Sequence, residues 1–273
     1  MGVFKIFKQK AETSSKAEGT KLKTGSDAAR EISNLSDVMS EKIKFTIDGK
    51  QCVADKGTNI VDAARLNGIY IPTLCHLDGV KPGGSCRICN VKINGRFMTA
   101  CTTEIAEGMV IENNKPDIQE LRHIIVETLF VSGNHYCPAC EKSGNCELQA
   151  LAYKFKMMVP RFPYEFEEKA VDALSAKIYI DRNRCILCKR CVRSLKSDDG
   201  KNIFALKGRG YKAMINIDHE LANKMTDEEA QHAMDTCPVG SILKKERGFV
   251  QPIGSRKFDK KPIGSEIEQT INQ

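Results

Sequence analysis

The feature that most constrains this chain is its set of twelve cysteines in 273 residues, eleven of which fall into three groups. The N-terminal stretch M-G-V-F-K-I-F-K-Q-K has no apolar segment of the kind found in secretory signal peptides. In a reducing intracellular compartment, thiols act as metal ligands or reactive groups before they form disulfides. We therefore expect a cytoplasmic protein that uses most of its cysteines to bind metal.

The first group has the spacing C-x10-C-x2-C-x11-C and consists of Cys75, Cys86, Cys89 and Cys101. Four thiolates of which three come from one long loop suit a [2Fe–2S] cluster, because the loop can curl around the inorganic core. Gly83 and Gly84 lie just before the second cysteine. They allow the backbone to approach closely and to direct N–H groups at sulfur.

The third group begins R-C-I-L-C-K-R-C-V-R, ends D-T-C-P, and consists of Cys185, Cys188, Cys191 and Cys237. A C-x2-C-x2-C turn places three thiolates on one side of a loop, which fits one face of a [4Fe–4S] cubane. A two-cluster ferredoxin would have a further cysteine four residues after the third one, where this chain has Leu195. The pattern therefore predicts a single [4Fe–4S] cluster at this group.

The middle group, G-N-H-Y-C-P-A-C-E-K-S-G-N-C, supplies only three thiolates, those of Cys137, Cys140 and Cys146. A cubane needs a fourth ligand, and His135 is the nearest remaining donor, whereas His123 lies farther upstream in an expected helix. Eleven cysteines and one histidine then complete one [2Fe–2S] and two [4Fe–4S] sites. The remaining Cys52 is on the apolar face of an expected strand and is interpreted as a buried structural thiol.

Two alternatives stay open for these groups. A C-x2-C pair is often half of a zinc site, so a zinc-binding module is the other interpretation of the cysteines. Three cysteines within seven residues, and a lone cysteine before proline, suit tetrahedral zinc poorly. An isolated histidine more often faces solvent than ligates metal, so the role of His135 rests on the cysteines beside it.

Composition and charge argue against several functional classes. Apolar residues make up 41% of the chain and charged residues 28%, as in globular proteins. The net charge of +7 is spread along the chain and forms no basic stripe, so we expect no nucleic-acid partner. The longest apolar runs, such as residues 124–131, are too short to span a bilayer. No G-x-G-x-x-G follows a strand, so no nucleotide fold is indicated.

Local patterns predict a small mixed sheet wrapped on one helix in the first half of the chain. Residues 1–41 are polar and without periodicity, and they are interpreted as an extension. Hairpins about Asp48-Gly49 and Asn94-Gly95 flank a helix that Thr58 caps and Gly68 ends. In the first hairpin, a two-residue turn pairs Phe45 with Cys52.

Helices and short strands are expected beyond residue 115. Pro116 suits the first turn of a long helix that stops near Gly133, and a second helix covers residues 147–154. After a Pro-containing connector, the strands I-Y-I-D and Y-K-A-M-I-N precede a helix from residue 227, where Thr226 and Glu229 have capping-box spacing. Residues 246–273 have no periodicity and are interpreted as a linker or an arm that wraps a partner.

The order of the three sites resembles the N-terminal part of the large iron–sulfur subunit of respiratory complex I. It is still more similar to the small diaphorase subunit of NAD-reducing [NiFe] hydrogenases. The motifs that carry the resemblance are G-N-H-x-C-x-x-C, G-N-C-E-L-Q, N-R-C-I-L-C-x-R-C-V-R and the tail G-F-V-Q-P-I-G-S-R-K-F-D-K-K-P-I-G-S. In the complex I pattern the ligand histidine lies four residues before the first cysteine, where this chain has Gly133.

The resemblance implies a relay between a flavin subunit that exchanges hydride with NAD(P) and a [NiFe] dimer of small and large hydrogenase subunits. We expect an α+β chain with a β-grasp [2Fe–2S] domain at 42–114, a helical [4Fe–4S] domain at 115–160, a ferredoxin-like [4Fe–4S] domain at 175–245 and a partner-binding tail at 246–273. An electron-bifurcating hydrogenase, an NAD-linked formate dehydrogenase or a complex I-like enzyme would use the same relay. A succinate dehydrogenase-type subunit would need two C-P endings, and only Cys237-Pro238 is present.

Overall fold

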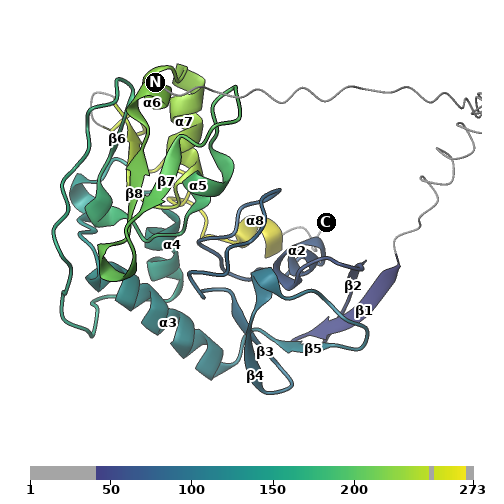
Figure 1. Cartoon of the computed structure of the whole chain (residues 1–273). Coiled ribbons are helices and arrows are strands. Elements are labelled where there is room, and N and C mark those ends of the chain that lie inside the picture. The colour runs from purple at the N-terminus through teal and green to yellow at the C-terminus, as the bar shows by residue number, and fades with distance from the viewer. Residues whose placement is uncertain (1–40, 246–248, 269–273) are drawn as a thin grey trace, which may run out of the picture. The chain divides into compact units, whose positions relative to one another are not determined.

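The computed structural model describes residues 41–245 and 249–268 (Figure 1). The extension expected over residues 1–41 therefore lies outside the described residues, except for Glu41. The described part is a mixed α+β structure, as the local patterns predict. None of its helices is both long enough and apolar enough to span a bilayer.

The first part of the chain is a five-stranded sheet with one helix packed on it. The elements are β1 (Lys42–Ile47), β2 (Lys50–Asp55), α2 (Ile60–Leu66), β3 (Asn90–Ile93), β4 (Arg96–Thr99) and β5 (Val110–Glu112). The strand order is β2-β1-β5-β3-β4, in which β1 and β5 are parallel and the other neighbours antiparallel. Phe45 faces Cys52 across the first hairpin, which confirms the predicted register.

The cap of α2 differs from the sequence prediction by one residue. Asn59 is the N-cap, because its side chain accepts a hydrogen bond from the backbone N–H of Asp62. Thr58 is instead held by its backbone, whose carbonyl accepts a hydrogen bond from Ile105. The prediction of Thr58 as the cap was therefore wrong, because a contact with a distant segment determines where the helix begins.

Two helices follow the sheet, α3 (Pro116–Val131) and α4 (Glu147–Lys154). Arg122 of α3 is almost fully buried, and its guanidinium donates hydrogen bonds to the backbone carbonyls of Asn90 and Asn113. A charged group so buried is stable only when its donors are used, so Arg122 fixes α3 against the end of the sheet.

The last part contains two small antiparallel sheets and three helices. These elements are β6 (Ile178–Ile180), α5 (Arg190–Ser194), β7 (Phe204–Lys207), β8 (Met214–Ile217), α6 (His219–Asn223), α7 (Asp227–Thr236) and β9 (Ile242–Lys244). Strand β6 pairs with β9, and β7 with β8. The predicted capping box of α7 is present, because Thr226 and Glu229 exchange side-chain-to-backbone hydrogen bonds.

Apolar side chains join these parts around the cysteine loops. Leu74 and Ile88, which flank cysteines of the first group, belong to the same buried core as α4 and the third group. Residues 249–268 end in the short helix α8 (Ser265–Glu268), and residues 256–258 of this segment lie on the loop before α4. Phe258 donates a backbone hydrogen bond to Gly144, and Arg256 donates to the carbonyl of Ser143. This part of the tail therefore packs on its own chain.

Candidate metal centres

The four cysteines of the first group converge where the loop after α2 meets the end of β4. Cys75, Cys89 and Cys101 are buried and Cys86 is half-buried. The Cys75 thiol is within hydrogen-bonding reach of the thiols of Cys86 and Cys101, and Cys101 is within reach of Cys89. Hydrogen bonds from the Cys101 and Cys86 thiols lower the pKa of Cys75. The predicted ligand set is therefore assembled at one point.

Backbone groups of the same loop direct N–H donors at these sulfur atoms. The Sγ atom of Cys75 accepts from the backbone of Cys86, and that of Cys89 from the backbone of Cys101. Gly84 makes this path possible, because its φ of +57° is disfavoured for residues with a side chain. Such hydrogen bonds tune the potential of a cluster, so the loop has the donors expected around bound sulfur.

The middle group surrounds a small cavity at the start of α4. Its lining contains His135, Cys137, Cys140 and Cys146 together. Burial raises the pKa of Cys146 to about 12. The backbone N–H of Gln149 donates to the Cys146 sulfur at 3.4 Å, so this cysteine also caps α4.

His135 has the properties of a neutral ligand. Burial, reinforced by the positive charge of Arg184, lowers the pKa of the imidazole to about 4. A hydrogen bond between the ring and the backbone of Leu129 holds the imidazole in place. A ligating histidine commonly binds a backbone carbonyl through its other nitrogen, which orients the ring. Its ring packs on Phe130, with 5.3 Å between ring centroids.

Two glycines leave the space that the middle group needs. A Cβ atom on Gly133 would lie 2.5 Å from the carbonyl oxygen of Asn183 and 3.1 Å from Nε2 of His135. The imidazole therefore lies beside the position where the complex I pattern has its histidine. A Cβ atom on Gly240 would overlap the sulfur of Cys140. The sequence prediction missed Gly240, which comes from the loop after α7.

The third group lines another small cavity with Cys185, Cys188, Cys191 and Cys237. The rest of the lining is mostly apolar and includes side chains of β6, β8 and β9. Burial raises the pKa of Cys185 to about 11 and that of Cys188 to about 12. Leu187 and Lys189 both have left-handed backbone angles, with φ of 51° and 59°, which curl the loop around the cavity.

The donor sets of all three groups fit iron–sulfur clusters. Thiolates in these buried positions would be poorly solvated on their own, and a bound metal would compensate their charge. One cavity brings together four thiols, and the other brings together three thiols and an imidazole. Cys52 lies elsewhere, buried in the core of the first sheet with its thiol 3.5 Å from the Lys50 carbonyl. Its burial was predicted.

Ion pairs and backbone hydrogen bonds connect the third group to the other two. The backbone N–H of Glu147, next to Cys146, donates to the carbonyl of Pro238 at 2.8 Å. The Glu147 carboxylate also accepts two 2.7 Å hydrogen bonds from Arg190, which is buried at the start of α5. On the other side, Arg193 reaches the carbonyl of Cys75. The sequence showed the arginines of R-C-V-R but not their partners.

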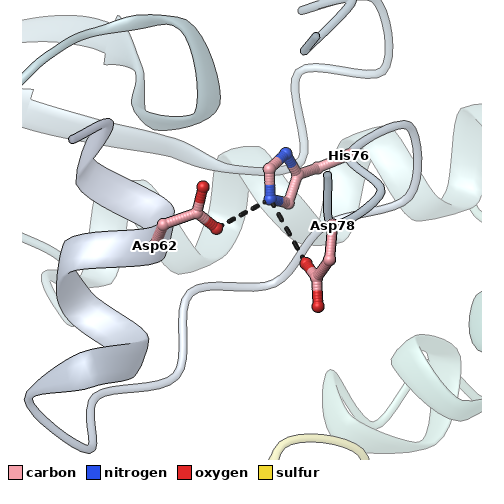
Figure 2. A group of neighbouring side chains, drawn as sticks. All are labelled: Asp62, His76 and Asp78. Atoms are coloured by element: carbon pink, nitrogen blue, oxygen red, sulfur yellow. Dashed lines mark hydrogen bonds and ion pairs between the residues drawn. The ribbon is translucent and has the colours of Figure 1, made fainter. Parts of the chain in front are cut away.

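A group of one histidine and two carboxylates lies beside the first cysteine loop (Figure 2). The Nε2 atom of His76 is 2.9 Å from Asp62 and 3.7 Å from Asp78. Asp78 is also ion-paired with Arg65 at 2.6 Å, and Asp62 accepts a hydrogen bond from Asn59. Because both carboxylates already have donors, this group is best explained as a network that fixes the turn after Cys75.

The sequence matches three protein-family models in the same order as the sites. They are a 2Fe-2S iron–sulfur cluster binding domain over residues 40–116, the NADH-ubiquinone oxidoreductase-G iron–sulfur binding region over residues 122–161, and a 4Fe-4S single cluster domain over residues 178–243. The chain therefore contains one domain of the 2Fe-2S class and two of the 4Fe-4S class.

Whole-chain comparisons give relatives of two kinds. The NAD-reducing hydrogenase HoxS subunit gamma of Cupriavidus necator is 47% identical over 80% of this chain and 93% of its own length. The NADPH-Fe(3+) oxidoreductase subunit alpha of Geobacter sulfurreducens is 35% identical over 74% of this chain, and the mitochondrial NADH-ubiquinone oxidoreductase 78 kDa subunit of Candida albicans is 30% identical over 81%. The chain spans only 24% and 31% of these two longer relatives.

A solved structure agrees with the first kind of relative. A chain in the crystal structure of an NAD+-reducing [NiFe]-hydrogenase in the H2-reduced state superposes with a TM-score of 0.75 at 36% sequence identity. The match covers 81% of the present chain and 95% of the other.

Proposed function

Because this chain belongs to the family of the iron–sulfur gamma subunits of NAD-reducing hydrogenases, we propose that it relays single electrons within such a hydrogenase complex. Its partners are then a flavin subunit that exchanges hydride with NAD(P) and the small and large subunits of a [NiFe] hydrogenase.

The observation that carries the proposal is the convergence of three separate sets of four soft donors in one chain. We assign one [2Fe–2S] cluster to Cys75, Cys86, Cys89 and Cys101. One [4Fe–4S] cluster is assigned to His135, Cys137, Cys140 and Cys146, and a second to Cys185, Cys188, Cys191 and Cys237. Two observations support the ligand assignment. The thiols of the first set contact one another, and each of the other two sets lines a cavity of its own.

The domains proposed for these sets are a β-grasp domain at 42–114, a helical domain at 115–160 and a ferredoxin-like domain at 175–245. The mixed sheet with one packed helix supports the first of these. The tail at 246–273 is proposed to contact a partner, because Phe249, Val250 and Ile253 are exposed although part of the tail packs on its own chain.

Iron–sulfur clusters supply one-electron transfer at potentials that their surroundings tune. The chain's own residues hold the thiolate sets close together, exclude water and place charge beside them. The apolar walls around the third set lower the local dielectric constant, and Arg190 adds a buried positive charge near Cys188. The hydrogen bond from Glu147 to Pro238 connects the third set to the middle group, and the one from Arg193 to Cys75 connects it to the first. These contacts favour a path in which electrons pass through the third set between the other two.

Metal analysis of the anaerobically purified complex tests this function. We expect about ten iron and about ten acid-labile sulfide per chain, in addition to the metal of the partner subunits, from one [2Fe–2S] and two [4Fe–4S] clusters. The chain produced anaerobically by itself should show the same content and should not oxidise hydrogen or reduce pyridine nucleotide. Zinc in place of iron and sulfide would refute the relay.

A further inference from the structure

Arg193, at the end of α5, connects the loops of two ligand sets. Its Nη2 atom donates to the carbonyl of Cys75 at 2.5 Å and its Nη1 atom to that of Lys81 at 2.6 Å. The same side chain donates to the carbonyls of Cys188 and Lys189, at 3.3 and 3.2 Å. One guanidinium therefore bonds two carbonyls of the first cysteine loop and two of the third, and two of the four belong to ligand residues.

The first loop is shaped to receive this guanidinium. A Cβ atom on Gly83 would lie 3.3 Å from Cζ of Arg193 and 3.5 Å from Nη2. A side chain at this position would make a tight contact with the guanidinium, which would have to shift by a few tenths of an ångström. The two glycines before Cys86 therefore have different roles. Gly84 has a left-handed φ, and Gly83 leaves room for the guanidinium of Arg193.

Arginine is suited to this place by its chemistry. Its planar fork of five donors can bond several carbonyls at fixed angles, and its charge persists at every pH at which the protein is folded. A lysine ammonium keeps the charge but holds its donors on a flexible stem without the fork. A neutral side chain would lose both the charge and the fork.

We propose that Arg193 is a positioning residue for electron transfer, which holds the first and third ligand sets at a fixed separation and orientation. The inference rests on the proposed function, because it concerns the passage of electrons between these two sets. The positive charge beside Cys75 and Cys188 also favours the reduced state at both sets, since reduction adds negative charge. Arg193 acts through the two loops whose carbonyls it binds.

The variants Arg193→Gln and Arg193→Lys separate charge from position, and Arg209→Gln is the matched control. Arg209 is an exposed arginine between β7 and β8, so its substitution removes the same charge outside the cysteine loops. Each variant is purified anaerobically in its complex, and iron and sulfide are counted first. Midpoint potentials and the magnetic interaction between the reduced clusters are then measured by electron paramagnetic resonance.

In R193Q we expect full iron and sulfide content, a lower potential at both the [2Fe–2S] cluster and the third-group cluster, and a weaker or more dispersed magnetic interaction between them. R193K should recover the potentials but not the magnetic interaction. R209Q should match the wild type in every measurement.

Wild-type potentials and magnetic interaction in a fully loaded R193Q protein would overturn the inference. If R193Q does not retain its clusters, R193K decides, and a loaded R193K protein with a wild-type magnetic interaction would equally overturn it. Absence of iron and sulfide from the wild-type chain would refute the proposed function itself, which is a different result.

Discussion

Substitution of Gly240 by alanine tests the middle ligand set through a single methyl group. The added Cβ atom would overlap the Cys140 sulfur and lie 3.3 Å from Cβ of Lys142. Gly240 does not have a positive φ, so alanine causes no backbone strain there and its whole cost is steric. Overpacking of this kind costs about 1–3 kcal/mol, and here the sulfur is the atom that must move.

We expect Gly240→Ala to remove or distort one [4Fe–4S] cluster, with a loss of up to about four iron per chain, while the [2Fe–2S] signal persists. Gly200→Ala is the matched control, because Gly200 has a φ of +77° and a Cβ atom added there would meet no other atom within 4 Å. This substitution costs roughly 1–2 kcal/mol of backbone strain, which is similar to the overpacking cost at Gly240, but it disturbs no cysteine. Iron analysis and electron paramagnetic resonance of the anaerobic proteins give the comparison.

A Gly240→Ala protein with the full iron content and an unchanged spectrum would refute the reasoning, because the Cys140 sulfur could then not be where the metal is bound. Equal iron loss in both variants would also refute it, since general destabilisation would be sufficient.

Three further substitutions, one of them with a matched control, test the ligand set and its supports. His135→Ala should alter or remove one cubane and leave the [2Fe–2S] signal, whereas His123→Ala should leave every cluster; an unchanged spectrum in the first variant would place the ligand elsewhere. Cys52→Ser should keep all clusters and lower the free energy of unfolding by about 1–3 kcal/mol, because it buries a hydroxyl in an apolar core; iron loss would contradict its structural role. Glu147→Ala should cost about 3–5 kcal/mol, since it leaves the buried Arg190 charge unpaired, and denaturant unfolding under anaerobic conditions measures this. A loss below about 1 kcal/mol, typical of an exposed ion pair, would show that the pair is not buried in solution.

The grouping of the cysteines could be predicted because most members of each set are close in sequence. The spacing C-x2-C-x2-C requires a tight turn whatever surrounds it, and Asp48-Gly49 and Asn94-Gly95 specify their hairpins locally. The capping box of α7 is equally local. Thr58 was mistaken for a cap because its real role depends on Ile105, which lies on a distant segment.

What the sequence by itself determined is therefore the chemistry of the chain: soft donors in three sets, a mixed α+β fold and no signal for a nucleotide site. Tertiary structure alone decided which residues stand between the sets. Gly240 enters the middle site from the loop after α7, and Arg193 crosses from α5 to the loop of Cys75. Residues far apart in sequence meet only when their elements pack, and no local pattern specifies such contacts.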